Sequence, residues 1–462
     1  MEQHIQHKNT PISVLEALGL VITIITIISL SLFVFKVEPH SPIFASIVIL
    51  IAFSLMKKHP WSYIEHGLKN GLKEGLIPIF LFILIGILIG IWMYSGTIPT
   101  LVYYGGKIMS ASFFLPSVFI ITAIIGTCIG SAFTTAATIG VAFMALGAGL
   151  GINPAIIAGA IISGAFFGDK MSPLSDTTNI ASAVSKVDLF DHIRHMLWTT
   201  IPAALICLVV FSVIGFGGNT GDIDHLDVLP VALKEAGMVS VWAILPAIAM
   251  FLAAMKRIPA IFVMLIGILS GAVIGFVLQP GTGISELMNV MQNGYIGQTG
   301  NEAIDGILTQ GGIQKMMWSV SLVLLTLSMG GLIQQLKVME RLIVAIRAKL
   351  VSTGRLILAT VLTAIGVNIT VGEQYMSIIL TGQAFEKEFE AKGIASKNLA
   401  RVLEDGGTVI NPLIPYGVSG VFMAGVLGVP VLDYLPYAIF CLASPLLSVF
   451  YGFTGISITN RD

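Results

Sequence analysis

The sequence predicts an all-α polytopic membrane protein, and its composition, its apolar runs and two polar interruptions are the observations behind this prediction. Of 462 residues, 55% are hydrophobic and only 11% are charged, whereas soluble domains carry about 25% charged residues. Apolar runs of 16 to 23 residues recur along the chain, and a helix needs about 20 apolar residues to cross a bilayer. We therefore expect a multi-pass protein of the cell membrane.

The predicted spans follow one another along the whole chain. The first apolar run, 14–35, is too long for the apolar core of a signal peptide and has no small-residue cleavage site after it, so we expect a membrane helix there. Further spans are expected at 41–56, 76–94, 112–128, 131–150, 154–185, 196–217, 239–255, 258–278, 316–336, 355–371, 373–388, 398–428 and 432–453. The total is about fourteen crossings, two of which, 154–185 and 398–428, are interrupted.

Loop charge predicts two halves of opposite orientation. Cytoplasmic loops collect Lys and Arg, so an inverted repeat exchanges the basic loops between its halves. The segment 57–75 has four lysines and its counterpart 283–313 has no basic residue, whereas 95–111 has one lysine and its counterpart 337–355 has five basic residues. We infer inverted halves at 1–238 and 239–462, with both termini cytoplasmic.

Short matching stretches support the same division. Three pairs recur at a separation of roughly 240 residues: Gly90 and Gly331, Ser172-Pro173 and Asn411-Pro412, Gly130-Ser131 and Gly372-Glu373. The acidic segment 222–227 between the halves is then expected outside the cell.

The stretch 164–179 is the most polar part of any predicted span. Pro173 interrupts a helix, which a membrane tolerates only where the opened backbone is buried in protein or lines a cavity. Its candidate cation- or proton-binding residues are Asp169, Ser172, Ser175, Asp176, Thr177, Thr178 and Asn179. Because a hard cation prefers oxygen ligands, we expect Na⁺ foremost at Asp176, Thr177 and Asn179. The alternative is a polar cytoplasmic loop in which Asp169 and Lys170 form a solvated pair.

A second interruption, 404–416, lies in the other half. Two prolines and two glycines rule out a regular helix there. We expect Thr408 and Asn411 at the centre of the site. Glu404 and Asp405 either join this site or cap a helix end near the cytoplasmic surface.

Two further segments flank the interruptions. Ser131, Thr134 and Thr135 belong to one hydroxyl-bearing helix face that also includes Thr138; the alternative is that these hydroxyls bond the preceding turn or a neighbouring helix. Glu373 is the only charged residue between 355 and 386, and burial favours the neutral form of a carboxyl group. We therefore expect Glu373 to carry a proton, with a structural hydrogen bond as the alternative.

Several other classes of protein are excluded. All eight histidines are expected in polar connecting segments and the three cysteines stand singly, so no metal site, cofactor or Ser–His dyad with Ser419 is expected. The glycines around Ser419, like Gly86 and Gly90, are expected at close helix contacts. A net charge of −1 gives no basic surface for nucleic acid. We expect transport and no enzymatic activity.

The two interruptions carry a family resemblance. The stretches G-D-K-M-S-P-L-S-D-T-T-N (168–179) and E-D-G-G-T-V-I-N-P-L-I-P (404–415) resemble signature stretches of the NhaC-type Na⁺/H⁺ antiporters of the ion transporter superfamily, and the resemblance spans nearly the whole chain. It implies a re-entrant hairpin and a discontinuous helix in each half, Na⁺ at Ser-Asn-Thr clusters, and alternating access. By position, the clusters are Ser172 with 175–179, and Thr408 with Asn411-Pro412, although the second lacks a full Ser-Asn-Thr run. The segments 131–150 and 373–388 then become parts of hairpins.

The expected function is secondary active Na⁺/H⁺ antiport. The alternatives are a Na⁺- and H⁺-coupled malate-lactate antiporter and, from another class, a cation channel. A dianionic substrate favours Arg or Lys at the midplane, but only Lys170 lies near an interruption, and Asp169 is expected to neutralise it. The expected partners are Na⁺, H⁺ and the lipid bilayer, and a homodimer is left open.

Overall fold

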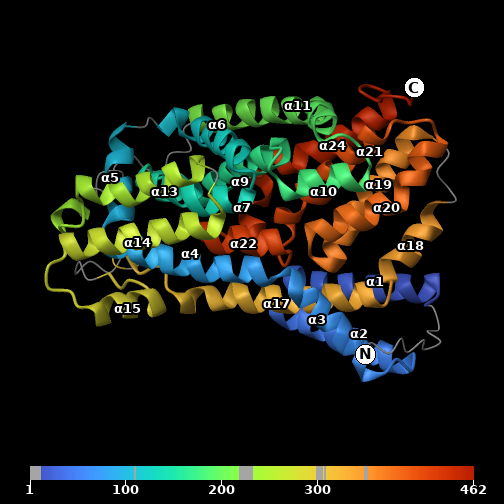
Figure 1. Cartoon of the computed structure of the whole chain (residues 1–462), viewed down its shortest axis with the longest axis horizontal. Coiled ribbons are helices and arrows are strands. Elements are labelled where there is room, and N and C mark those ends of the chain that lie inside the picture. Colours follow the sequence, from blue (N-terminus) through green and yellow to red (C-terminus); the bar gives the residue numbers. More distant parts are fainter. Residues whose placement is uncertain are drawn as a thin grey trace.

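A computed structural model describes residues 12–108, 111–217, 233–256, 258–297, 305, 308–347 and 352–461 of the chain. Within these ranges the protein is helical, and strand-like pairing is limited to the isolated bridges Tyr295–Gln310 and Ile394–Asn460. Most of the long helices run along the long axis of the molecule (Figure 1). The predicted all-α fold is confirmed.

The helices of the first half are α1 (Val14–Ser29), α2 (His40–Met56), α3 (Trp61–Glu74), α4 (Leu76–Tyr94), α5 (Thr97–Ile108), α6 (Ala111–Ile129), α7 (Ala132–Thr135), α8 (Val141–Gly149), α9 (Pro154–Met171), α10 (Asp176–Val184) and α11 (Leu189–Phe216). Those of the second half are α13 (Leu245–Met255), α14 (Ala260–Leu278), α15 (Ile284–Asn293), α17 (Ile313–Gln335), α18 (Val338–Arg347), α19 (Thr353–Val371), α20 (Gln374–Ala391), α21 (Ser396–Leu403), α22 (Val418–Leu427), α23 (Val431–Tyr434) and α24 (Ile439–Thr454). Short π-helical turns include Ala136–Gly140 and Glu404–Thr408.

The described residues contain fewer potential spans than the fourteen predicted. Nine helices are long and apolar enough to cross a membrane, or up to eleven if each of two bent pairs counts as one. One bent pair, α21 with α22, coincides with the predicted interruption, and a second interruption separates α9 from α10 as predicted. The other bent pair is a correction: the span predicted at 432–453 bends by 59° between α23 and α24, at a turn that contains Pro436.

Segments predicted to be connections contain four further helices, α3, α5, α15 and α18. Their polar residues hid them from a search for apolar runs. Helix α3 lies tightly against α17: a Cβ atom at Gly71 would overlap the Leu327 carbonyl oxygen, and one at Gly331 would overlap the Gly67 carbonyl oxygen.

Two parts of the loop-charge argument lie outside the described residues. They are the side chain of Lys107 and the acidic segment 222–227.

Helix α11 begins seven residues before the predicted span. The Asp188 side chain caps it by accepting hydrogen bonds from the backbone amides of Phe190 and Asp191. As a result, His192 and His195 lie inside this helix, and both are buried. Their prediction as loop residues was wrong, because the capping residue rather than the apolar run sets the start of the helix.

Two helical hairpins have closely matched tips. The first joins α6 to α7 at Gly130, and the second joins α19 to α20 at Gly372; both glycines have left-handed backbone, with φ of 75° and 79°. The residue after each glycine, Ser131 or Glu373, caps the next helix by accepting from the backbone amide three residues on. The predicted sequence pair Gly130-Ser131 and Gly372-Glu373 therefore has one local conformation in both halves.

Each hairpin tip packs against an interrupted helix. Gly130 packs so closely against Leu174, in the link between α9 and α10, that a Cβ atom at this glycine would lie only 2.7 Å from Leu174 Cβ. At the second tip, the Val418 amide at the start of α22 donates to the Gly372 carbonyl oxygen at 2.8 Å. Figure 1 places α7, α9 and α22 near the middle of the molecule. The two hairpins and the two interrupted helices thus meet in the interior.

Candidate functional site

A cavity of about 410 Å³ lies where the hairpin tips meet the starts of α10 and α22. Ser131 and Thr134 line it from the first hairpin, Glu373 lines it from the second, and Asp176 lines it from the first turn of α10. The rest of the wall is largely apolar and includes parts of α4 and of the turn between α13 and α14. The cavity therefore brings together four of the predicted site residues, from three separate segments of the chain.

Most polar groups of the first interruption, between α9 and α10, form hydrogen bonds within the interruption itself. The Thr178 hydroxyl donates to the Lys170 carbonyl oxygen across the break at 3.1 Å, and the Ser175 and Thr177 hydroxyls lie 2.9 Å apart. The Asn179 amide donates to the carbonyl oxygens of Pro173 and Ser175. These contacts, with the buried Ser172, close the break, and Asp176 is the one residue of this group that lines the cavity.

Asp169 and Lys170 are both buried, so the alternative of a solvated pair is wrong. The expectation that Asp169 neutralises Lys170 is also wrong, because consecutive residues of a helix do not face each other. The Lys170 ammonium instead lies 2.5 Å from Oδ1 of Asp405, and both side chains are fully buried. The Asp169 carboxyl group instead lies near Ser175 and near Ala132 at the first hairpin tip.

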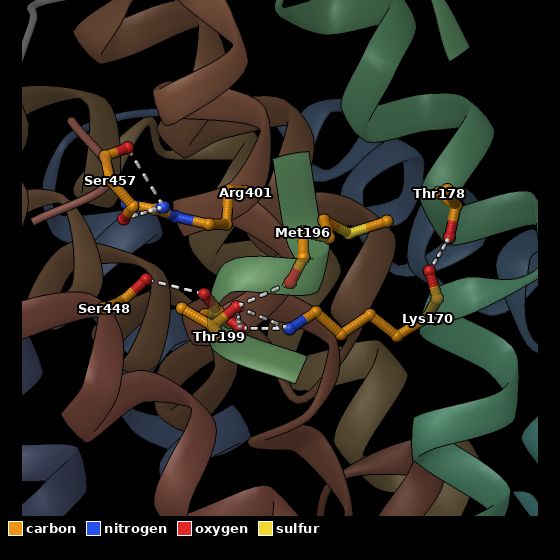
Figure 2. A network of polar contacts seen from close by, with 8 residues as sticks. Lys170, Thr178, Met196, Thr199, Arg401, Ser448 and Ser457 are labelled. Carbon is orange, nitrogen blue, oxygen red and sulfur yellow. Dashed lines mark hydrogen bonds and ion pairs between the residues drawn. The ribbon is translucent and has the colours of Figure 1, made fainter. Parts of the chain in front are cut away.

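The ion pair between Lys170 and Asp405 has a complete set of partners. Thr199 donates to Oδ1 of Asp405 at 3.3 Å and accepts from Lys170 at 3.1 Å, while Ser448 donates to Oδ2 at 2.6 Å. Figure 2 shows Lys170, Thr199 and Ser448 converging on this point from separate elements. Such saturation offsets the cost of burying two charges, so this network joins α9, α11, α24 and the π-helical turn after α21.

The second interruption is buried throughout. Glu404 and Asp405 have no exposed surface, which excludes their alternative role as caps at a cytoplasmic helix end. Asn411 donates to the Asn368 side-chain oxygen at 2.9 Å and accepts from the Ser419 amide at 2.8 Å. Neither Thr408 nor Asn411 lines the cavity, although both were expected at the centre of the site. Asn411 instead ties the broken helix to α19 and α22.

The hydroxyl-bearing segment after Gly130 divides into two pairs. Thr135 and Thr138 donate to the carbonyl oxygens of Ser131 and Thr134, four residues earlier, as the alternative interpretation expected. The side chains of Ser131 and Thr134 line the cavity. Only the second pair is available to a ligand there.

Three polar residues that line the cavity were not among the predicted site residues: Gln374, Tyr375 and Ser419. Ser419 donates to the side-chain oxygen of Gln374 at 3.2 Å and so links α22 to the second hairpin. The signal for Gln374 and Tyr375 was their position directly after Glu373. The glycines beside Ser419 do make close contacts as expected, since a Cβ atom at Gly420 would overlap the Ile414 carbonyl oxygen.

A cavity that contains carboxyl and hydroxyl groups at the meeting point of interrupted helices, inside an all-helical membrane protein, is typical of secondary transporters. Residues 164–456 match the Na⁺/H⁺ antiporter family. The chain belongs to this family, and the resemblance inferred from its two interruptions is confirmed.

Curated relatives agree over most of the chain. The Na⁺/H⁺ antiporter NhaC of Alkalihalophilus pseudofirmus is 46% identical, with 94% of each chain covered. The Na⁺/H⁺ antiporter NhaC of Bacillus subtilis is 44% identical over 95% of this chain and 97% of its own. The malate-2H⁺/Na⁺-lactate antiporter of Bacillus subtilis is 38% identical over 79% of this chain and 78% of its own.

Proposed function

We propose that this protein is a secondary active Na⁺/H⁺ antiporter of the cell membrane that exchanges Na⁺ for H⁺ by alternating access. Its relatives named NhaC support the two ions. The observation that carries the proposal is the cavity in which Asp176 and Glu373 approach from different halves of the chain. Both transported ions are cations, and a carboxylate binds either of them.

The cavity offers a hard cation the ligands that it prefers. Asp176 and Glu373 supply carboxylate oxygens, and Ser131 and Thr134 supply hydroxyl oxygens. Glu373 caps α20, so the positive end of a helix dipole favours its ionised form, and Asp176 is the first residue of α10. When Na⁺ is absent, burial of Glu373 favours the protonated form instead. Competition between Na⁺ and H⁺ for the same oxygens then gives antiport.

The alternative of malate-lactate exchange fits this cavity less well. The residues that line it include two carboxylates and no Lys, Arg or His. The buried Lys170 stands apart from the cavity with Asp405 as its partner. A dianion would therefore meet repulsion from Asp176 and Glu373 without a basic residue to bind it.

We further propose that the halves 1–238 and 239–462 are inverted in the membrane and that both hairpins are re-entrant. The matched tips at Gly130 and Gly372 and the matched interruptions support this arrangement. In a variant without native cysteines, single cysteines at Lys69 and Lys387 should be protected from an impermeant thiol reagent outside intact cells. Cysteines at Glu286 and Asp433 should react, and labelling of all four from one side would contradict the inversion.

Flux in proteoliposomes tests the function directly. An imposed pH gradient should drive ²²Na⁺ uptake that needs neither malate nor lactate. A strict requirement for either acid would instead establish the malate-lactate alternative. Single-channel currents far above the rate of a carrier would replace antiport with a channel.

A further inference from the structure

The cavity wall includes two uncharged, oxygen-bearing side chains that have no role in the function proposed above, those of Gln374 and Ser419. Gln374 is the first residue of α20, and Ser419 lies in the first turn of α22. Both are buried, with 7% of Gln374 and none of Ser419 exposed. Buried polar groups need a partner. These two partner each other, because the Ser419 hydroxyl donates to Oε1 of Gln374 at 3.2 Å.

The direction of this hydrogen bond leaves both oxygen atoms able to bind a cation. A serine hydroxyl has one hydrogen, and that of Ser419 is already donated to Gln374, so the Ser419 oxygen can only accept. The side-chain carbonyl oxygen of Gln374 has a second lone pair besides the one that accepts from Ser419. A hard cation binds carbonyl and hydroxyl oxygens. The pair therefore offers two neutral ligands beside the carboxylates of the cavity.

Backbone contacts hold the two side chains in this position. The Val418 amide donates to the Gly372 carbonyl oxygen at 2.8 Å, and the Ser419 amide donates to Oδ1 of Asn411 at 2.8 Å. Gly372 lies two residues before Gln374, so a backbone bond and a side-chain bond both join the start of α20 to the start of α22. Ligands that are held in place before an ion arrives bind it with a smaller loss of entropy.

Neutral ligands matter here because the charged groups of the cavity bind Na⁺ and H⁺ alike. The titratable side chains that line the cavity are those of Asp176, Glu373 and Tyr375. Helices α4, α6, α7 and α22 contain no charged residue, and the other charged residues of α20 lie in its C-terminal half. Lys256, beside the turn between α13 and α14, is exposed and does not line the cavity.

The charged residues of the surrounding elements lie away from Gln374 and Ser419. Lys315 of α17 and Asp433 of α23 line a separate cavity at the far end of α22. Arg355 belongs to the first turn of α19, at the opposite end of that helix from the second hairpin tip. Five further charged residues are buried elsewhere in the interior and do not line the cavity: Asp169, Lys170, Arg401, Glu404 and Asp405.

We propose that Gln374 and Ser419 are neutral Na⁺ ligands that determine how strongly Na⁺ competes with H⁺ in the cavity. This inference rests on the proposed antiport. A proton binds to the carboxylate of Asp176 or Glu373, whereas a side-chain amide and a serine hydroxyl take up no proton in the working pH range. Na⁺ is stabilised by all of these oxygens. The two neutral ligands therefore raise the affinity for Na⁺ and leave the affinity for H⁺ unchanged.

Calorimetry of Na⁺ binding at a series of pH values separates the two affinities. Competition raises the apparent Kd for Na⁺ as the pH falls, and the limit at alkaline pH is the intrinsic Kd. Ser419→Ala and Gln374→Leu should each raise the intrinsic Kd by roughly tenfold. The proton affinity obtained from the same curves should not change, because both carboxylates remain. A general disturbance of the cavity would change both affinities.

The matched control is a second buried hydroxyl group on α20. Ser377 donates to the Ala364 carbonyl oxygen at 2.7 Å and does not line the cavity. Ser377→Ala removes the same atom as Ser419→Ala, and it should leave both affinities at their wild-type values. If Gln374→Leu does not fold, Ser419→Ala alone decides the outcome, because alanine fits wherever serine does.

The possible outcomes separate this inference from the antiport proposal. An unchanged intrinsic Kd in Ser419→Ala overturns the inference, and so does a change of equal size in the proton affinity. Either result leaves the antiport proposal standing, provided that the wild-type Kd for Na⁺ depends on pH. If the wild-type Kd is the same at every pH, Na⁺ and H⁺ do not compete, so the antiport proposal itself fails and the inference fails with it.

Discussion

In the first interrupted helix, α9 with α10, the acidic residue after the break opens onto the cavity, whereas in the second, α21 with α22, the acidic residues before the break are enclosed in protein. Asp176 is exposed, while Glu404 and Asp405 have no exposed surface. Both breaks have buried charged residues before them, Asp169 and Lys170 in the first and Glu404 and Asp405 in the second, but only the first also presents a carboxylate to the cavity after the break. The residues on the two sides of a break need separate tests.

The largest effect is expected at the open break. Asp176→Asn keeps the side-chain shape but removes the charge for which Na⁺ and H⁺ compete. We expect Na⁺-driven proton movement to be lost and Na⁺ affinity to fall by roughly 10- to 100-fold. Na⁺ binding by calorimetry and flux in proteoliposomes measure this, with Asp191→Asn, at an exposed site on α11, as the control. Unchanged exchange with an unchanged KM for Na⁺ would remove Asp176 from the site.

The second carboxyl group that lines the cavity, that of Glu373, is expected to set the pH dependence of transport. Glu373→Gln removes a proton-binding group but keeps an oxygen that can cap α20 through the Met376 amide. We expect the rise and fall of Na⁺ flux with pH to flatten, while the protein still inserts normally. Flux measured across a range of pH values checks this. A mutant with a normal pH profile and lower expression would make Glu373 a structural residue.

Mutations in the buried ion pair at the second interruption should lower the stability of the fold. Lys170→Met leaves Asp405 ionised and unpaired in the interior, which costs about 3–5 kcal/mol. Removing both charges, in Lys170→Met with Asp405→Leu, should recover much of that loss. The matched control is the exposed pair Lys69–Glu65, whose loss should cost less than about 1 kcal/mol. Denaturant unfolding in detergent compares the variants, and equal losses at the two sites would contradict the assigned difference.

The smallest effect concerns the first hairpin tip. Ser131→Ala removes the side chain that accepts from the Thr134 amide at 3.2 Å, and loss of such a cap costs about 1 kcal/mol. Because the Ser131 side chain also lines the cavity, we expect a modest rise in the KM for Na⁺ in the same variant. A stability loss without any change in KM would limit Ser131 to capping.

The sequence predicted the fold class, the position of both interruptions and the bounds of α4, because a run of apolar residues and a proline act locally. It also singled out Asp176, a carboxylate in a polar interruption, and Glu373, an isolated carboxylate in apolar sequence. The pairing of Lys170 with Asp405 could not be predicted from the sequence, since 235 residues separate the two in the chain. Thr199 and Ser448 gave no signal, because a lone hydroxyl in an apolar helix usually bonds its own backbone.

Thr408 and Asn411, expected at the centre of the second site, do not line the cavity, for a related reason. Both were placed there because they are polar residues within an interruption. Whether such side chains face a cavity or another helix depends on the helices packed around the interruption. Here Asn368 of α19 takes up the Asn411 amide. A polar residue inside a membrane protein has to be satisfied by something, and the sequence does not say whether that is a ligand or another helix.

The contact between Lys170 and Asp405 has a mechanical consequence. It joins α9 to the turn after α21, and separating the two would leave opposite charges unpaired in a medium of low dielectric constant. These interrupted helices should therefore travel as a single rigid body during turnover. Ile77, Pro78 and Ile258 make part of the cavity wall apolar, so a movement of this body along that part of the wall would break no hydrogen bonds to these side chains.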